Sequence, residues 1–143
     1  MFSKACEYAI RAVVYIASGT SETSKVSIDD ICAHIEAPRH FTAKILQVLT
    51  RKNIVSSQKG VHGGFFINNI QRALPIKQIV TAIDGENLFT GCALGLKQCS
   101  HKKPCPMHHQ FVVIRDELNR VMNETSVDML AKRMADGSSV LKR

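Results

Sequence analysis

Apolar residues recur at helical spacing through the first third of the chain. Over residues 4–18 they repeat at intervals of three and four, and Gly19 ends the run, which predicts a helix. A second apolar stripe begins after Ser27, which is placed to cap a helix with Asp30 three positions later. A break at Pro38 then starts a third helix. Two short helices joined by a tight turn are typical of the helix-turn-helix motif.

The third predicted helix has an apolar face and a polar face. At about 100° per residue, Phe41, Ile45, Val48 and Leu49 lie together on one side. Leu46 lies off both faces, and we expect it to pack against a neighbouring element. The other side is small, polar and basic, as a helix that enters the major groove of DNA needs to be. The candidate DNA-contacting residues of this helix are Arg39, His40, Thr42, Ala43, Lys44, Gln47 and Arg51.

Two short apolar runs enclose a glycine-rich loop directly after this helix. Residues 54–57 and 65–67 have the composition of strands, so they predict a hairpin, which is the wing of a winged-helix domain. Glycine lets a backbone approach DNA closely, so Lys59, His62 and Gly63 are candidate contacts to phosphate or to the minor groove. A Walker-type phosphate cradle is excluded because the loop lacks Gly-Lys-Ser/Thr and no helix begins at it.

The second half of the chain predicts three more elements. Pro75 begins a short helix that ends near Asp84-Gly85, and an irregular segment follows it. After Pro106 comes a long helix whose apolar residues are spaced four, three, four and three, a seam of about two heptads. This seam suits a dimerisation helix that crosses its twin, and packing within one subunit is the alternative. The seam residues are Met107, Phe111, Ile114, Leu118 and Val121.

These elements predict a mainly α fold with a small β wing: a winged helix-turn-helix domain plus a long dimerisation helix. The winged helix-turn-helix domain is expected over residues 1–84, and a cysteine-bearing loop over 85–105. The dimerisation helix and a last helix, capped by Thr125 with Asp128 and ending near Ala135, are expected over 106–135. Residues 136–143 are expected to be a disordered tail.

The charge is concentrated in the middle of the chain. The formal net charge is +7, and no Asp or Glu occurs between Glu36 and Asp84. An acid-free basic interval points to a polyanion, with double-stranded DNA the first choice and an anionic membrane surface the second. It also argues against a protein adaptor that has lost DNA binding. The positive residues in this interval are Arg39, Lys44, Arg51, Lys52, Lys59, Arg72 and Lys77.

Composition limits the class of protein and its compartment. The chain has 143 residues and no run of about eighteen apolar residues that could span a bilayer. The apolar stretch from Ala9 to Ala17 is interrupted by Arg11 and keeps a helical period, so we do not interpret it as a signal peptide. Five cysteines are an odd number, and their clustering argues against a secreted disulfide framework. We therefore expect a reducing cytoplasm and no membrane partner.

Three of the five cysteines, Cys92, Cys99 and Cys105, fall within fourteen residues, among three of the six histidines. Thiolate and imidazole favour zinc or an iron–sulfur cluster. The gaps between these cysteines are wider than those of a zinc finger, which favours a wrapping loop. Cys6 and Cys32 have no such neighbours, so we expect them to be core residues.

Other chemistries remain open for this cysteine-bearing segment. The same thiolates and a histidine could close around a structural zinc ion, and the clustered thiols alone could form a redox switch. An enzyme is the weakest interpretation. A Cys105/His108 nucleophile pair can be drawn, but no orienting acid, oxyanion loop or cofactor fingerprint accompanies it.

In this order, the motifs resemble a family of winged-helix transcription regulators that includes IscR, NsrR and RirA. The resemblance covers the chain to about residue 135. The features that carry it are Glu7-Tyr8-Ala9-Ile10-Arg11, Val55-Ser56-Ser57, Gly60, Gly63-Gly64 and the three clustered cysteines.

The resemblance implies a homodimeric regulator, with repressor the first choice, that binds a pseudo-palindromic operator. It implies that Cys92, Cys99 and Cys105 hold an iron–sulfur cluster, 2Fe-2S or 4Fe-4S, which senses redox state, nitric oxide or iron status. One branch of the family takes its fourth ligand from a histidine three residues after the last cysteine, where His108 lies. Another branch uses an acidic residue of the partner subunit, and Glu7 matches that position. We expect His108, with the partner subunit's Glu7 as the alternative.

Overall fold

Helix α1 (Lys4–Gly19) is the element on which most of the others pack. In this computed structural model, which describes residues 1–19 and 23–143, it contacts α2, α3, α5 and α8. The polar loop that the sequence predicts over residues 20–25 falls partly outside the described residues. Ala9, Ala12 and Ala17 on α1 are fully buried, and their small side chains let neighbouring helices approach closely.

Helices α2 (Ile28–Ile35) and α3 (Arg39–Arg51) form the predicted helix-turn-helix. Ser27 caps α2 by accepting a hydrogen bond from the Asp30 backbone N–H, as expected. The turn begins at Glu36, whose φ of 52° is in the left-handed region. Arg11 of α1 donates to the Ile35 carbonyl at 2.9 Å, so the end of α2 is fixed to the central helix.

The buried face of α3 differs from the prediction. The fully buried positions are Ile45, Leu46, Leu49 and Thr42, so the expected packing of Leu46 is confirmed. Phe41 and Val48 lie on the same side of α3 as Ile45, as expected, and all three line one pocket, but Phe41 is 38% exposed and Val48 is only half-buried. The reason is that α3 packs between α1, α2 and α5, so its contact face is wider and rotated relative to a single apolar stripe.

The wing is a two-stranded antiparallel sheet of β1 (Ser56–Gln58) and β2 (Gly64–Phe66), in which Ser57 pairs with Phe65. Both strands are offset from the predicted runs, and the first is one residue shorter, because Ile54, Val55 and Ile67 are buried in the core instead of joining the ladder. Val26 forms a single antiparallel bridge with Phe65. Gly63 is required by close approach, since a Cβ there would lie 2.1 Å from the Gln58 carbonyl oxygen.

Two short helices were not predicted. Helix α4 (Asn69–Arg72) follows the wing and is opened by a capping box between Asn68 and Gln71. Helix α6 (Asn87–Thr90) begins the segment that was expected to be loop throughout. Between them, α5 (Ile76–Asp84) follows Pro75 as predicted and ends at Gly85.

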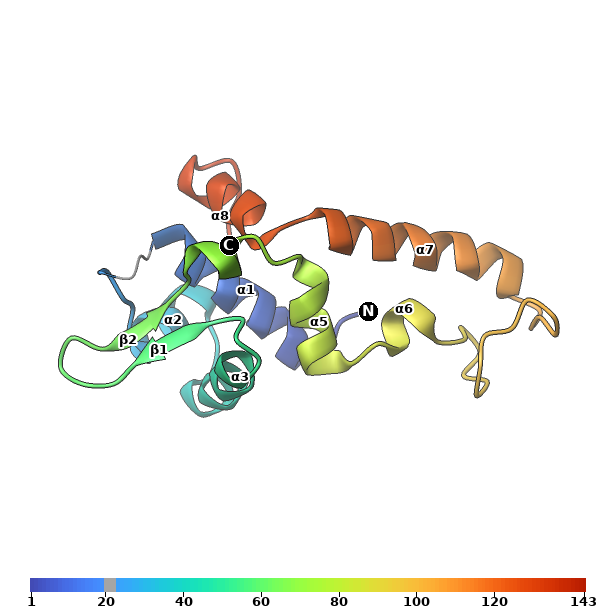
Figure 1. Ribbon diagram of the computed structural model, residues 1–143, viewed down its shortest axis with the longest axis horizontal. Helices are drawn as coiled ribbons and strands as arrows, with labels where there is room; N and C mark the ends of the chain where they lie inside the picture. Colours follow the sequence, from blue (N-terminus) through green and yellow to red (C-terminus); the bar gives the residue numbers. More distant parts are fainter. Residues whose placement is uncertain (20–22) are drawn as a thin grey trace.

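Helix α7 (His108–Glu124) extends away from the body, and α8 (Val127–Ala135) returns to pack on α1 (Figure 1). The cap of α8 is Ser126, which accepts from the Met129 N–H, and not Thr125 as predicted. Thr125 ends α7 instead, and its carbonyl accepts from the Ile76 N–H at 2.9 Å.

The predicted seam of α7 divides between two faces. Leu118 packs inward with Met122 on a small second core, formed by Cys6, Val80 and Phe89. Phe111 is half-buried. The remaining seam residues are exposed, with Met107 at 46%, Ile114 at 65% and Val121 at 40%. Val113, which the seam did not include, lies beside Ile114 and is 69% exposed.

The wing and the cysteine-bearing segment are separated along the molecule. The wing lies at one end of the long axis, and the cysteine-bearing segment lies at the other, beyond the start of α7 (Figure 1). The tail after Ala135 has no helix or strand, and its residues 139–142 line a pocket with Tyr15 and His34. Across the described ranges, no helix is both long and apolar enough to cross a membrane.

Candidate functional site

The outward face of α3 is polar and open to solvent. His40, Lys44, Gln47 and Arg51 are all exposed, and Ala43 between them is half-buried. Arg39 is also exposed and pairs with Asp29, with its Nε 2.7 Å from Oδ1. Both side chains of that pair are mostly solvated, so the pair is weak and Arg39 can exchange its carboxylate for a phosphate.

Thr42 does not belong to this exposed face, and its prediction as a DNA contact was wrong. Its side chain is fully buried, and its hydroxyl donates to the Pro38 carbonyl at 2.9 Å. Thr42 therefore stabilises the first turn of α3 from its buried side, and its side chain is not available for contact with DNA.

Not all cations of the acid-free basic interval are available at the surface. Arg72 turns inward, where it donates to the Ala17 carbonyl and pairs with Asp128 at 3.3 Å. Lys77 lies over the Phe89 ring, and its Nζ is 3.8 Å from Glu86 Oε2. These two cations hold helices together, and five remain for a polyanion: Arg39, Lys44, Arg51, Lys52 and Lys59.

The wing tip projects fully into solvent. Lys59 and His62 are exposed, Gly63 is half-buried, and Val61 between them is 98% exposed. Gly60 has a φ of 108°, which gives the tip its tight turn, and the Gly63 N–H donates to the Gly60 carbonyl at 3.0 Å. The tip is therefore a narrow loop with one cation, shaped to enter a groove.

The three clustered cysteines and two histidines meet in pairs at the start of α7. Cys92 Sγ and Cys105 Sγ are 3.6 Å apart. Cys99 Sγ lies 3.3 Å from His108 Nδ1, and His108 Nε2 lies 3.0 Å from His101 Nδ1. His109 packs edge-on against the His108 ring with centroids 5.2 Å apart.

Local backbone turns position these side chains. The Gly95 N–H donates to the Cys92 carbonyl at 3.0 Å, and Gly95 has a φ of 72° that favours glycine. The His108 N–H donates to the Cys105 carbonyl at 3.0 Å, which fixes the last cysteine to the first residue of α7. His108 is only 2% exposed, so the helix delivers its ring into the cysteine segment and not into solvent.

Two of these groups are biased towards the forms that bind a metal. The backbone N–H groups of Leu94 and Leu96 hydrogen-bond to Cys92 and lower the pKa of its thiol. Burial, with the neighbouring His101, lowers the pKa of His108 and favours the neutral ring. A thiolate and a neutral imidazole are the ligating forms of these side chains.

The distances within the two side-chain pairs are those expected for two ligands of one metal ion. Two thiolates bound to one tetrahedral ion at about 2.3 Å lie about 3.8 Å apart, and a thiolate and an imidazole nitrogen about 3.5 Å apart. Cys92–Cys105 at 3.6 Å and Cys99–His108 at 3.3 Å match these values. Within the described chain, however, no three such side chains converge as a ready site for one ion.

The other candidates lie apart from these pairs. Glu7 is on α1, where it pairs with Lys4 at 2.8 Å, and the Lys4 ammonium lowers the pKa of its carboxyl. Cys6 is fully buried in the second core, and burial raises the pKa of its thiol to about 12. Cys32 is half-buried on α2. The prediction that Cys6 is a core residue is confirmed.

Sequence reasoning missed two buried polar residues that support these surfaces. Gln71 lies beneath the wing, and Arg115 lies on α7 beside the start of the cysteine segment. Apart from the local cap with Asn68, their hydrogen-bond partners are 15 to 25 residues away, so periodicity carries no signal for these contacts.

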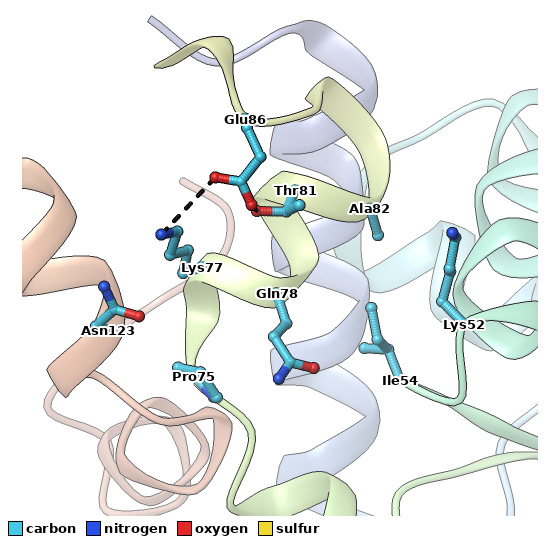
Figure 2. Close-up of a pocket in the computed structure, with 9 residues that line it drawn as sticks. All are labelled: Lys52, Ile54, Pro75, Lys77, Gln78, Thr81, Ala82, Glu86 and Asn123. Atoms are coloured by element: carbon cyan, nitrogen blue, oxygen red, sulfur yellow. Dashed lines mark hydrogen bonds and ion pairs between the residues drawn. The ribbon is translucent and has the colours of Figure 1, made fainter. Parts of the chain in front are cut away.

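A shallow pocket lies along α5, between the end of α3 and the end of α7. In Figure 2, Lys52 approaches it from α3 and Asn123 from α7, and Lys77, Gln78 and Thr81 of α5 lie between them. Lys77 and Glu86 form the ion pair drawn there. Helix α3 and the helix that carries His108 therefore both border α5.

Comparisons with known proteins agree with this arrangement. The Rrf2 family, described as iron-dependent transcriptional regulators, matches residues 2–133. A helix-turn-helix-type transcriptional regulator of Aquifex aeolicus (strain VF5) is 26% identical over 129 residues, covering 89% of this chain and 88% of the relative.

Two solved structures share the fold. CymR, the global cysteine regulator of B. subtilis, superposes with a TM-score of 0.73 at 17% identity, covering 92% of this chain and 96% of its own. T. potens IscR gives a TM-score of 0.73 at 14% identity, covering 98% and 92%. These structures support the winged-helix fold that the sequence predicted. The family match covers nearly the whole chain, and the chain therefore belongs to the Rrf2 family of DNA-binding transcriptional regulators, which are not enzymes.

Proposed function

We propose that this regulator binds DNA as a homodimer and that an iron–sulfur cluster held by Cys92, Cys99, Cys105 and His108 sets its affinity for DNA. The observation that carries the proposal is the pairing of these four side chains, Cys92 with Cys105 and Cys99 with His108, at separations expected for two ligands on one metal. The description of the family as iron-dependent supports the same conclusion.

The pairing favours a two-iron cluster. Two pairs offer two ligands to each of two irons, and three thiolates with one imidazole are soft and borderline donors of the kind iron–sulfur clusters use. When bound, the cluster supplies a redox-active and nitric-oxide-reactive group. The chain supplies its ligands, the backbone N–H groups that stabilise the Cys92 thiolate, and the burial of His108.

In the proposed complex with DNA, α3 and the wing make different contacts. Arg39, His40, Ala43 and Gln47 are placed to contact base edges in the major groove, and the lysines to contact phosphates. The wing tip adds Lys59 and His62 at the neighbouring groove. In a homodimer, two such surfaces bind a pseudo-palindromic operator, and the exposed face of α7 at Ile114 and Val121 supplies the contact between subunits.

The first test is iron and acid-labile sulfide content, with a visible spectrum, on protein purified without oxygen. Equal iron and sulfide, two of each per chain, are expected. His108→Ala should lose the cluster, whereas His109→Ala, the exposed neighbour on the same helix, should keep it. Retention by His108→Ala with loss in Glu7→Gln would transfer the fourth ligand to the partner subunit's Glu7.

The second test compares loaded and metal-free protein on duplexes selected from a random pool with each form. Fluorescence anisotropy at fixed salt should give different affinities for the two forms. Equal affinities for every selected duplex would refute control by the cluster and would leave DNA binding untouched.

A thiol switch is the second candidate, because Cys92 and Cys105 are also close enough to react. Their Sγ atoms are 3.6 Å apart, and the lowered pKa of Cys92 favours the attacking thiolate. With a peroxide as oxidant, the two thiols would lose two electrons and two protons to form one disulfide, and hydrogen peroxide would become two waters or an organic hydroperoxide an alcohol and water. Metal-free protein that forms this disulfide and changes its DNA affinity would favour this candidate.

A further inference from the structure

Arg115 is a buried cation at the base of the cysteine segment. Its side chain is 10% exposed, which is unusual for an arginine on a helix that extends into solvent. Nη1 donates to two backbone carbonyls, Thr90 at 3.3 Å and Gly91 at 3.1 Å. Those carbonyls end α6 and immediately precede Cys92. The guanidinium therefore fixes the chain to α7 at the point where the first thiolate leaves it.

The hydrogen bonds that Arg115 makes do not satisfy its charge. Within the described residues, its buried Nε has no hydrogen-bond acceptor. The Asp116 carboxylate is 3.7 Å from Nε and is 66% exposed, so water screens it. Neutral carbonyls at 3.1 and 3.3 Å compensate only part of the cost of burying a cation. A buried cation with a free donor is the pattern expected beside an anionic group.

The base that Arg115 contacts is itself tightly built. The Gly91 N–H donates to the Asn87 carbonyl at 2.8 Å, and a Cβ at Gly91 would lie 2.3 Å from Asn87 Oδ1. The same Cβ would lie 2.6 Å from the Asn87 backbone carbonyl oxygen, so glycine allows the chain to pass close to Asn87 just before Cys92. Arg115 also follows His108 by seven residues, two helical turns, and both side chains are buried on α7.

We propose that Arg115 is a positioning residue for the cluster site, one that anchors Cys92 to α7 and places a buried positive charge beside the anionic ligand set. The proposal rests on the proposed function. Three thiolates on a cluster core of charge 2+ leave a net negative charge, which grows on reduction. A nearby buried cation stabilises that charge, and stabilises the reduced state more than the oxidised state.

The test uses two substitutions at Arg115 and one matched control. Arg115→Gln removes the charge but keeps a donor, and Arg115→Lys keeps the charge but loses the planar guanidinium, whose Nη1 donates to two carbonyls. Arg120→Gln removes a cation from the same helix, where Arg120 is 53% exposed and pairs with Glu117 and Glu124. All three are compared with wild type as full-length, anaerobically loaded protein.

Three readouts separate the two roles. Transfer of iron to a chelator should be about tenfold faster or more in both Arg115 variants, as for other residues that support metal ligands. The midpoint reduction potential should fall in Arg115→Gln and stay near wild type in Arg115→Lys. In metal-free protein, hydrogen exchange at the Gly91 amide should be faster in both Arg115 variants and unchanged in Arg120→Gln.

Each possible result decides part of the proposal. Iron transfer and hydrogen exchange equal to those of Arg120→Gln would overturn the anchor. An unchanged potential in Arg115→Gln would overturn the role of the charge. If Arg115→Gln does not fold, Arg115→Lys still tests the anchor. A clear shift of the midpoint reduction potential in Arg115→Lys would overturn the separation of the two roles. If wild type binds no iron or sulfide, the proposed function fails, and hydrogen exchange alone decides the anchor.

Discussion

Replacing Gln71 with alanine should loosen the base of the wing and destabilise the protein. Gln71 is 5% exposed, and its Oε1 accepts from Ser56 Oγ and from the Asn68 N–H, both at 3.0 Å. Its Nε2 donates to the Asn53 carbonyl at 3.1 Å. One side chain therefore joins the turn after α3, the first wing strand and the turn after the second strand.

The magnitude follows from these three hydrogen bonds. Each contributes about 1 kcal/mol net, and the substitution also leaves the Asn68 N–H and the Asn53 carbonyl without partners. We expect Gln71→Ala to lower the free energy of unfolding by about 3 kcal/mol. The Asn68 side-chain cap on the Gln71 N–H involves only the backbone of Gln71, so α4 should still form.

Urea unfolding of metal-free protein, followed by circular dichroism at one protein concentration, measures this loss. Gln78→Ala is the control, because Gln78 is exposed on α5, and it should change stability by less than about 0.5 kcal/mol. DNA affinity measured at low urea should fall for Gln71→Ala alone. A loss below about 1 kcal/mol for Gln71→Ala, or a loss equal to that of the control, would refute the role assigned to this network.

Three further predictions test other surfaces. Gly63→Ala places a Cβ 2.1 Å from the Gln58 carbonyl oxygen, so the wing must change shape; DNA affinity by anisotropy should fall about tenfold, or about 1.4 kcal/mol, with the helical circular dichroism unchanged. Ile114→Glu should weaken self-association by about 2 kcal/mol or more in analytical ultracentrifugation, whereas Glu117→Gln on the same helix should not. The hydrogen bond from Lys132 and the pair with Arg72 lower the pKa of Asp128, so its stabilisation is present above the unfolded value of about 3.9 and is lost as pH falls through the lower folded value. Urea titrations from pH 7 to pH 3 should therefore show a steeper acid loss for wild type than for Asp128→Asn, and equal slopes would contradict the assignment.

The elements with local signals were predictable from sequence. Ser27 caps α2, Pro38 precedes α3 and the glycines of residues 60–64 form the wing turn, because caps and turns depend on residues a few positions apart. The spacing of the cysteines likewise identified the segment that the structure brings together at His108.

What the sequence could not give depends on contacts between distant elements. Thr42 is buried because α3 contacts three other helices, which a periodicity argument for one face does not include. Arg72 belonged to a basic interval by position, but its partners Ala17 and Asp128 lie 55 and 56 residues away. In the sequence, Arg115 is one of several charged residues on a polar helix, and its contact with the Gly91 carbonyl, 24 residues away, has no local signal.

The arrangement of helices restricts how the cysteine segment can influence DNA binding within one subunit. The wing and the cysteine segment lie at opposite ends of the long axis (Figure 1), and α5 packs against both α7 and α3. The end of α7 is held to the start of α5 by two backbone hydrogen bonds, from the Ile76 N–H to the Thr125 carbonyl at 2.9 Å and from the Val127 N–H to the Leu74 carbonyl at 3.0 Å. A displacement of α7 must therefore move α5 or break these bonds. Because Ala82 and Ile83 of α5 line one pocket with α3, a moving α5 reaches the DNA-facing helix directly.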